Sequence, residues 1–515
     1  MAPIASARPD VLIVGAGGAG AVLAARLSED GDRRVLLLEA GAVPPAFAPE
    51  LLDTRVVPGA RPGHPATFAH AVRLTPDRPW SVPRGRVLGG STTVNGGYFV
   101  RAPRADFDRW AGAGNPAWAY ERVLPLLRRL ENDLDFGGSG PHGDRGPLCV
   151  ARGPLTHPAA SAFRDAAHEL GFPAEPDKNA PGPPGFGPVP SNSVDGVRLN
   201  TGLAYLPPAV RERPSLAVVG GCSVRRVVVE RGRVTGVVVE RDGGASETVG
   251  AGCVVVCAGA LATPHLLLLS GIGPRADLER TGVPVVRDTP AVGARLSDHP
   301  QLVLDWLPRD DLAPPTTTWL GGSLHLNSRA GGVGCPGDIE ILQSLVPMAG
   351  LVSGTVRVPG APLSFLASVQ TPHPTGRLRL LSADPAVSPA IDYDYLRDDE
   401  VLRRLRVAVR TTADLLDTAP FTELSDGGLL APGADVLGDD RALDTWIRDH
   451  PGTAQHTCGT VPMGPAVDQY GRVHGVRGLR VADTSILPDT PHRGPTATAV
   501  LIGELVADAM RRELP

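Results

Sequence analysis

Three glycines near the N-terminus have the spacing that binds the phosphates of a dinucleotide. Gly15, Gly17 and Gly20 follow the apolar run 11–14 and precede an apolar, helix-like segment, 21–27. The first glycine of such a set permits a tight turn, the second lets a pyrophosphate approach the backbone, and the third lets the helix pack against the strand. The pattern therefore predicts a strand, a phosphate-binding turn and a helix, in that order.

An acidic residue follows where a ribose would lie. A second apolar run, 34–38, predicts the next strand and leads into Glu39. In a βαβ nucleotide-binding unit, a carboxylate about 20 residues beyond the glycines accepts hydrogen bonds from the ribose hydroxyls. The free N–H groups and the positive dipole end of the helix favour the phosphates. These residues together predict that the N-terminal part of the chain binds a dinucleotide.

The composition excludes several other classes of function. The chain has 515 residues, 42% of them hydrophobic, and a net charge of −5, and this length predicts two domains or one large domain with an insertion. No basic run marks a nucleic-acid surface, and no stretch reaches the ~20 apolar residues of a membrane helix. Six cysteines without a CxxC pair predict neither a disulfide framework nor a zinc site. The lack of a secretory signal favours a cytoplasmic location, with peripheral contact to the inner membrane as a variant.

The elements that must position the dinucleotide are spread along the chain. The segment 498–511 predicts a long amphipathic helix, and the proline-punctuated region 300–450 predicts a second domain. Further apolar runs predict strands of the nucleotide-binding layer, the first three as a β-meander: 216–219, 224–229, 234–239, 253–257 and 479–482.

Two longer glycine-containing blocks resemble those of a known enzyme family. The segments 85–97 (GRVLGGSTTVNGG) and 259–273 (GALATPHLLLLSGIG) are similar to the two signatures of the glucose–methanol–choline (GMC) oxidoreductases, flavoproteins that act on alcohols. The resemblance continues in chain order to about residue 505 through the segments 292–300, 380–385, 456–464, 472–481 and 483–485.

The resemblance implies an α/β fold with an α+β second domain. A Rossmann-like FAD-binding domain of the GMC type would carry an inserted substrate-binding domain built on an antiparallel sheet. We expect the FAD-binding domain to combine 1–155, 200–298 and 455–515, and the substrate-binding domain to combine 156–199 and 299–454.

FAD is the cofactor that the resemblance implies, held in an extended pocket between the domains. Some family members carry a histidine that bonds covalently to the flavin, but Val94 stands at that position here, so we expect non-covalent FAD. The resemblance places Gly15, Gly17, Gly18, Ala19 and Gly20 at the pyrophosphate, Glu39 and Ala40 at the ribose, Gly90, Ser91, Asn95, Gly96 and Gly97 under the pyrophosphate and flavin, Val224 at the adenine, and Asp483, Thr496, Ala497 and Thr498 over the flavin.

The catalytic residues follow from the same resemblance. Alcohol oxidation removes a hydroxyl proton and passes a hydride to flavin N5, which calls for a base that titrates near neutral pH, usually histidine. His456 stands at the family's catalytic position. The second family position, His or Asn, falls on Thr496, counted back from Glu504 in the last helix. Because threonine can donate a hydrogen bond but is no base at neutral pH, we expect Thr496 to orient the substrate oxygen, with His492 as the alternative.

Shorter stretches resemble the mycofactocin-associated GMC dehydrogenases of actinobacteria, namely 95–101, 134–147, 187–196 and 492–495. This implies that the chain oxidises a small-molecule alcohol or reduced mycofactocin and passes electrons towards a respiratory acceptor. The alternatives are a choline- or alcohol-oxidase-type enzyme that uses oxygen, and an FAD-containing lyase of the same fold.

Two further features are predicted to be structural. His299, in an Asp-His-Pro turn, is expected to hold the domain boundary through side-chain hydrogen bonds. The acidic residues of 392–400 are expected to form a solvated helix start and not a metal site.

Overall fold

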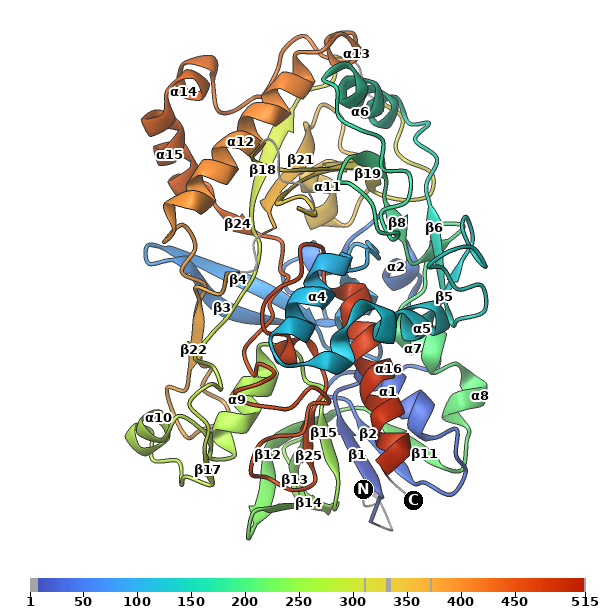
Figure 1. The fold of residues 1–515 in the computed structure, drawn as a ribbon, viewed down its shortest axis with the longest axis vertical. Coiled ribbons are helices and arrows are strands. Elements are labelled where there is room, and N and C mark those ends of the chain that lie inside the picture. The colour runs from blue at the N-terminus through green and yellow to red at the C-terminus, as the bar shows by residue number, and fades with distance from the viewer. Residues whose placement is uncertain (1–7, 310–311, 330–334, 371–372, 514–515) are drawn as a thin grey trace.

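A parallel sheet of five strands occupies the lower part of the molecule (Figure 1). The computed structural model describes residues 8–309, 312–329, 335–370 and 373–513. The strand order is β11-β2-β1-β15-β25, and every neighbouring pair runs parallel. The strands come from distant parts of the chain: β1 (Val11–Val14), β2 (Val35–Leu38), β11 (Leu216–Val219), β15 (Val254–Val256) and β25 (Leu479–Val481). The predicted α/β nucleotide-binding fold is confirmed.

Two helices pack side by side next to this sheet, α1 (Gly20–Leu27) and α16 (Thr496–Glu513) (Figure 1). They approach closely because α16 has a glycine at the contact: a Cβ on Gly503 would lie 2.7 Å from the Ala19 carbonyl oxygen. The carboxylate of Glu504 is buried beside them, and it accepts hydrogen bonds from Arg26 of α1 (2.9 Å) and from the Tyr205 hydroxyl (2.8 Å). The predicted C-terminal helix is confirmed and extends two residues further at each end.

A three-stranded antiparallel meander follows the parallel sheet: β12 (Cys222–Glu230), β13 (Arg233–Arg241) and β14 (Ser246–Gly250). The prediction that 216–219 belongs to this meander is wrong, because that segment is β11 and pairs with β2. Gly221, with φ +64°, turns the chain away from the parallel sheet before β12 begins. An apolar run predicts a strand but not its partner, so the sequence could not separate the two sheets.

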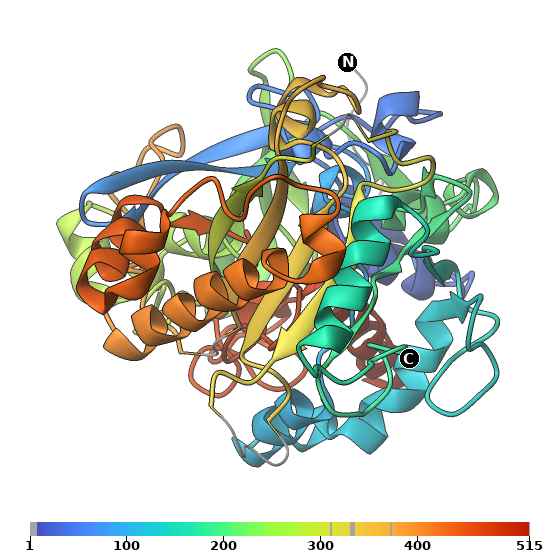
Figure 2. The same ribbon diagram turned by 90° about the horizontal axis from the view of Figure 1, so that it is seen from above.

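The upper part of the molecule contains an antiparallel sheet of six strands, in the order β24-β18-β21-β20-β19-β7. Helices α12 (Asp399–Leu416) and α6 (Pro158–Glu169) pack against it (Figure 2). Asp398 caps α12 by accepting a hydrogen bond from Glu400 N (2.9 Å), so the predicted helix start is confirmed for 398–400. It is wrong for Asp392, which is buried at the end of a strand. The strands are β7 (Phe186–Pro188), β18 (Pro300–Trp306), β19 (Leu320–Leu326), β20 (Ile339–Ser344), β21 (Leu363–Val369) and β24 (Gly452–Thr453). The predicted antiparallel sheet of the second domain is confirmed.

A long hairpin connects distant parts of the chain between these two sheets. Strands β3 (Thr67–Thr75) and β4 (Arg78–Gly85) pair with each other, and β3 continues through β23 (Ala390–Asp392) to β22 (Arg377–Arg379). Strand β4 ends at Gly85, where the second glycine-rich block begins. The hairpin therefore fixes the position of that block.

The remaining elements are short or lie at the surface. Small strand pairs connect the loops: β5 (Glu131–Asp133), β6 (Leu148–Arg152), β8 (Pro190–Ser191), β9 (Ser193–Val194), β10 (Val197–Arg198), β16 (Ile272–Gly273) and β17 (Arg287–Asp288). The other α-helices are α2 (Pro49–Leu52), α3 (Ser91–Val94), α4 (Arg104–Gly112), α5 (Tyr120–Leu130), α7 (Thr201–Tyr205), α8 (Pro208–Arg211), α9 (Ala262–Leu269), α10 (Arg275–Arg280), α11 (Met348–Ser353), α13 (Ala419–Thr422), α14 (Ala434–Gly438) and α15 (Asp440–Asp449).

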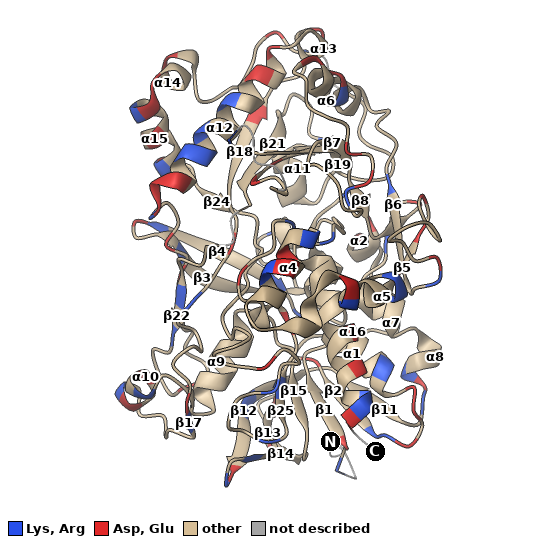
Figure 3. Cartoon of the chain, viewed as in Figure 1, with Lys and Arg blue, Asp and Glu red and all other residues tan. Residues whose placement is uncertain are grey.

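Charged residues are frequent on outer helices such as α12 and α15 (Figure 3), whereas β1, β2 and β15 contain none. The two helices are joined by an ion pair between Arg406 and Asp444 (2.6 Å). Among the described residues, no helix has the length and hydropathy needed to span a bilayer.

Candidate active site

The two glycine-rich blocks of the sequence lie against each other. Gly90, with φ +53°, precedes α3, and a Cβ on it would lie 2.7 Å from Gly17 Cα. Ser91 is exposed at the start of α3, and its hydroxyl accepts a hydrogen bond from Gly85 N (3.1 Å). Because no side chain intervenes, the turn that leads into α1 and the turn that leads into α3 together expose backbone to one ligand. This is the contact expected at the pyrophosphate.

Glu39, immediately after β2, presents an ordered carboxylate beside the first turn. Its Oε2 accepts a hydrogen bond from Ala16 N (2.8 Å), and its Oε1 accepts one from Gly41 N (2.9 Å). Burial raises the pKa of Glu39, although the two backbone hydrogen bonds act in the opposite direction. The carbonyl of the adjacent Ala40 accepts a hydrogen bond from Arg86 Nε (3.3 Å). The Glu39 carboxylate therefore lies directly beside the glycine turn. This arrangement suits a nucleotide, in which the ribose and the phosphates are neighbours.

The start of α16 faces the second glycine-rich block. Thr496 Oγ1 accepts a hydrogen bond from Asn95 Nδ2 (3.4 Å), and Asn95 Oδ1 accepts one from Gly97 N (3.0 Å). Ala497 and Thr498 are buried, and the Thr498 hydroxyl has no partner in the part of the chain that the structure describes. A buried hydroxyl without a partner normally indicates a missing ligand or water. The Thr498 hydroxyl lies at the N-terminal, positive end of this 18-residue helix. Both features suit the electron-rich edge of a bound ring.

The antiparallel sheet contributes an aromatic wall to the same place. Trp319, just before β19, donates a hydrogen bond from Nε1 to the Gly96 carbonyl oxygen (2.8 Å). A Cβ on Gly96 would lie 2.6 Å from Trp319 Cζ2, so the indole needs a glycine there. The segment 95–97 is therefore in contact with the antiparallel sheet as well as with the start of α16. Nothing in the sequence predicted this contact.

Two residues expected to bind the cofactor, Asp483 and Val224, have contacts or backbone positions that suit an indirect role. Asp483 is buried, which raises its pKa, and its Oδ2 accepts hydrogen bonds from Gly259 N (2.9 Å) and Thr263 Oγ1 (2.6 Å). It therefore holds the second family signature in place. Val224 lies on β12 at an irregularity of the pairing between Val224 and Arg226. Such a bulge leaves backbone groups unpaired, as a backbone contact with adenine requires.

The residues brought together fit FAD. Glycine turns before α1 and α3 suit the phosphates, Glu39 suits a ribose, and the backbone at Gly96 and Gly97 can approach a flat ring closely. The unpaired Thr498 hydroxyl offers a polar contact at the other edge.

His456 lies in a segment that loops out between two pairs of bonded residues. Ser297 pairs with Cys458, and Pro300 pairs with Thr453, so 454–457 loops out opposite 298–299. Gln455, directly before His456, has φ +62°, a left-handed conformation that is uncommon for such a residue. Strained backbone of this kind clusters at functional sites.

The imidazole of His456 has the properties of a base. The residue is partly buried, and burial lowers its pKa, while the negative charges of Asp298 and Glu340 raise it. Its Nε2 edge faces Gly494, where a Cβ would lie 3.3 Å from Nε2. A neutral ring with a clear Nε2 edge can accept a proton near pH 7.

His299 contacts His456 directly. The two Nδ1 atoms are 2.9 Å apart, and the rings are nearly perpendicular, with centroids 5.1 Å apart. The side-chain hydrogen bond of His299 is therefore made to His456, and Ala454 N also donates a hydrogen bond to the His299 carbonyl oxygen (3.0 Å). The ring contact was missed because the two histidines are separated by 157 positions, and no local pattern connects them.

Thr496 and His492, the two candidates for the second catalytic position, face different partners. Thr496 bonds to Asn95, as described above. His492 Nδ1 lies 2.6 Å from Asp106 Oδ1 of α4, and His492 N donates to Asp106 Oδ2 (2.7 Å). Burial acts to raise the pKa of Asp106, but the neighbouring His492 and Arg109 lower it below its usual value. The His492 ring is therefore already bound by a carboxylate.

A buried polar chain that no sequence pattern predicted runs from Tyr98 into the second sheet. The Tyr98 hydroxyl donates to Glu340 Oε2 (3.0 Å), which also lies 2.9 Å from His325 Nε2. His325 Nδ1 in turn accepts from Lys178 Nζ (3.2 Å), and Lys178 donates to Glu175 Oε2 (2.6 Å). Lys178 is the only lysine of the chain. Neither the residue type of Lys178 nor its position in the sequence predicted this network.

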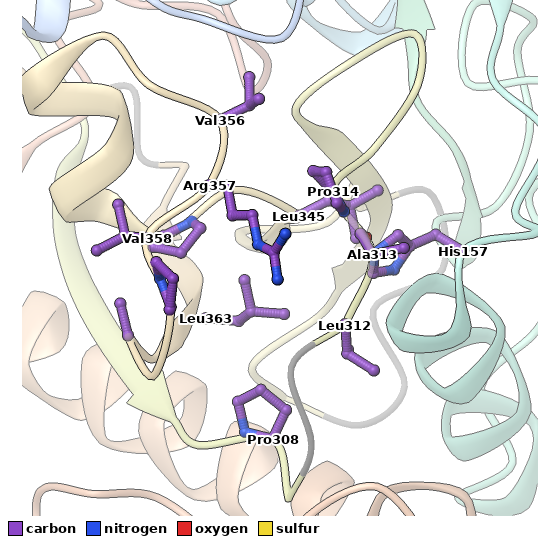
Figure 4. A pocket seen from close by; sticks show the side chains of 13 residues that line it. His157, Pro308, Leu312, Ala313, Pro314, Leu345, Val356, Arg357, Val358 and Leu363 are labelled. Atoms are coloured by element: carbon purple, nitrogen blue, oxygen red, sulfur yellow. The ribbon is translucent and has the colours of Figure 1, made fainter.

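A separate hollow lies in the second domain (Figure 4). Its wall is mostly proline and aliphatic side chains, namely Pro308, Leu312, Ala313, Pro314 and several residues of 345–363, together with Arg357 and His157. It contains none of the residues expected to bind FAD or substrate.

Comparison with known proteins connects this geometry to a family. Two family profiles, both described as GMC oxidoreductase, match residues 9–301 and 372–503. The chain is 38% identical to the uncharacterized GMC-type oxidoreductase of the thcA 5′ region in Rhodococcus erythropolis, over 96% of this chain and 97% of that protein. It is 35% identical to the oxygen-dependent choline dehydrogenase of Sinorhizobium medicae, over 98% and 96% of the two chains.

Solved structures share the fold. Pyridoxine 4-oxidase from Mesorbium loti superposes with a TM-score of 0.90 at 29% identity, over 98% of this chain and 99% of that one. A formate oxidase superposes with a TM-score of 0.89 at 24% identity, over 99% of each chain. From these matches, the chain belongs to the GMC oxidoreductase family, and it is an enzyme whose cofactor is FAD.

Proposed function

We propose that this enzyme oxidises an alcohol, with His456 as the base that takes the hydroxyl proton. The observation that carries the proposal is a partly buried imidazole whose pKa is lowered by burial and whose Nε2 faces Gly494, two positions before Thr496. The hydroxyl proton passes to Nε2 while the same carbon loses a hydride, so that the alcohol becomes a carbonyl compound. FAD, when bound, supplies the hydride acceptor at flavin N5.

Thr496 is proposed to orient the substrate oxygen. It stands at the start of α16 next to Asn95, on the side of the flavin-binding segment. Its hydroxyl can donate one hydrogen bond to the reacting oxygen, but it cannot take the proton at neutral pH. His492 is the less suitable candidate, because Asp106 already binds its Nδ1.

FAD is proposed to be non-covalent. Val94 is buried in a small apolar cluster with Leu51, Ala66 and Val87, and an aliphatic side chain offers no nucleophile to the flavin. Acid precipitation should therefore release the yellow cofactor into the supernatant, and colour retained in the pellet would contradict the proposal.

The same proposal assigns FAD binding to one domain and substrate binding to the other. Segments 1–155, 200–298 and 455–515 would bind FAD, and segments 156–199 and 299–454 would cover the substrate. The contact between Trp319 and Gly96 supports a site at the boundary of the two.

Anaerobic mixing with alcohols tests the proposal. FAD-loaded enzyme is mixed with a panel of aliphatic, aromatic and cationic alcohols, and flavin bleaching is followed by absorbance. The names of the relatives, a choline dehydrogenase and a pyridoxine oxidase, support an alcohol donor. Bleaching with stoichiometric carbonyl product is the expected result. Aldehyde release from cyanohydrins without bleaching would favour the lyase alternative instead.

Reduced mycofactocin is the electron donor that the shorter resemblances favour, and we propose it as the specific substrate. The same anaerobic experiment includes it as a separate arm, followed by reoxidation with a quinone or with oxygen. Bleaching by reduced mycofactocin at lower concentration than by any simple alcohol is the expected result, and no bleaching would remove this donor. Faster reoxidation by oxygen than by quinone would favour the oxidase-type alternative.

A further inference from the structure

We infer that His299 sets the tautomer of His456 and thereby keeps Nε2 of the base free to accept the substrate proton. The inference rests on the proposed role of His456 as the base. It assigns His299 a positioning role, because its ring contacts the base and not the reacting atoms.

The proton count between the two rings leads to this assignment. The Nδ1 atoms are 2.9 Å apart, so one of them donates and the other accepts. Burial lowers the pKa of both rings, and a neutral imidazole carries one N–H and one lone pair. If His456 Nδ1 donates, its Nε2 has the lone pair. If His299 Nδ1 donates, His456 Nε2 is protonated and cannot act as the base.

The proposed role of His456 decides between the two arrangements. Its Nε2 must carry a lone pair to take the substrate proton, so its Nδ1 carries the hydrogen and donates to His299 Nδ1. A neutral His299 then has its own proton on Nε2, a buried atom that has no hydrogen-bond partner among the described residues.

The surrounding backbone makes this arrangement rigid. Next to His299, Asp298 Oδ2 accepts hydrogen bonds from Tyr395 OH and Thr453 Oγ1, both at 2.6 Å. His299 is completely buried. The positioning ring and the base therefore form one hydrogen-bonded unit, and Gly494 faces Nε2 of the base.

The same contact stabilises the base after it takes the proton. Protonated His456 keeps its Nδ1–H, which donates to the neutral His299 ring, and a hydrogen bond from a charged donor is stronger than one from a neutral donor. Other charged and titratable groups that act on the pair are Asp298, Glu340, Arg84, His492 and Arg493. None of them is hydrogen-bonded to either Nδ1 among the described residues, so His299 occupies the place that a carboxylate takes in a catalytic triad.

Three variants separate a positioning role from a purely structural one. His299→Leu removes the acceptor, whereas His299→Asn keeps an amide oxygen that can accept from His456 Nδ1. His265→Leu is the matched control, because it removes a partly buried, neutral imidazole on α9 whose Nε2 has no partner among the described residues. Each is measured by stopped-flow flavin reduction across pH.

The expected results follow from the strength of a hydrogen bond to a charged group. His299→Leu should slow flavin reduction by about ten- to a hundredfold and lower the apparent pKa of the rate profile by about one to two units. His299→Asn should recover most of the rate, and His265→Leu should leave the profile unchanged. An unchanged pH profile in His299→Leu would overturn the inference, whereas a wild-type rate in His456→Ala would instead refute the proposed base.

A second readout needs neither activity nor a folded His299→Leu variant. Protein labelled with ¹⁵N-histidine, with the His456 signals identified by their loss in His456→Ala, reports which nitrogen of His456 is protonated. We expect Nδ1 protonated and Nε2 unprotonated near pH 7. A protonated Nε2 in the wild-type enzyme would overturn the inference.

Discussion

Replacement of His142 by glutamine should remove a pH-dependent part of the enzyme's stability. His142 is 1% exposed and lies between three carboxylates. Its Nδ1 is 3.0 Å from both Glu131 Oε1 and Asp133 Oδ2, and its Nε2 is 2.8 Å from Asp177 Oδ2. A ring with acceptors at both nitrogens donates from both, so it is an imidazolium.

The charges around His142 explain why the cluster needs this proton. Glu131, Asp133 and His142 are close enough to hold a metal ion, but Arg101 lies 2.6 Å from Glu131 and Arg152 lies 2.5 Å from Asp133. Two arginines and one imidazolium balance the three carboxylates. Loss of the His142 charge would leave one buried carboxylate without compensation, which is strongly destabilising.

The magnitude follows from the pKa of His142. Burial acts to lower it, but hydrogen bonds to Asp133, Asp177 and Glu131 raise it from 6.5 to about 10. A shift of this size corresponds to at most about 5 kcal/mol of folding free energy. Because the folded pKa is the higher one, this contribution is fully present below about pH 6.5 and is lost as the pH rises to about 10.

Thermal unfolding of the FAD-loaded enzyme between pH 6 and pH 10.5 measures the effect. For a chain of this length, about 1 kcal/mol corresponds to about 1 °C in Tm, so His142→Gln should lie on the order of 3–5 °C below wild type near pH 6.5. The gap should narrow as the pH approaches 10, while a glutamine at the exposed His168 should leave Tm unchanged. Parallel wild-type and His142→Gln curves over the whole range would refute the reasoning.

Three further substitutions test the cofactor cradle and the space around the base. Gly90→Ala should weaken FAD binding at least tenfold in a fluorescence titration, because its Cβ would lie 2.7 Å from Gly17 Cα at a φ of +53°. Gly31→Ala is the control, since a Cβ at Gly31 meets no atom within 4 Å. Equal Kd values for FAD in the two variants would argue against contact between the two glycine turns. Gly494→Ala should slow flavin reduction by about tenfold with FAD retained, because the methyl group would approach His456 Nε2 to 3.3 Å; a normal rate would show that Nε2 does not face the substrate there. Thr496→Val should cost about 1–2 kcal/mol in the barrier to flavin reduction, the value of one hydrogen bond, and a larger loss in His492→Ala would move the second catalytic role to His492.

The sequence predicted what depends on local pattern. The strand, glycine turn and helix of 11–27 are contiguous, and so is the segment 85–97, so each motif specifies its own backbone. Glu39 follows β2 directly and needs no distant partner. His456 was found through a motif that surrounds it in the sequence.

What the sequence could not predict depends on contacts between distant segments. His299 reaches His456 only because Ser297 pairs with Cys458 and Pro300 pairs with Thr453. The position of β11 next to β2 is likewise a matter of sheet order, which an apolar run does not encode.

The same limit applies to side chains whose partners come from several elements. Trp319 is ordered by a carbonyl oxygen 223 positions away. Lys178, at the end of the buried chain that begins at Tyr98, reaches His325 across 147 positions. Residue type alone did not distinguish these side chains from others in an ordinary core.

Flavin reduction in His456→Ala tests the central claim most directly. FAD-loaded wild-type enzyme and variant are mixed anaerobically with a bleaching alcohol in a stopped-flow instrument, with FAD content measured beforehand. A positioned base contributes about 10²–10⁴-fold, so His456→Ala should bind FAD normally and reduce it slower by that factor. A variant that reduces its flavin at the wild-type rate would contradict the assignment of His456 as the base.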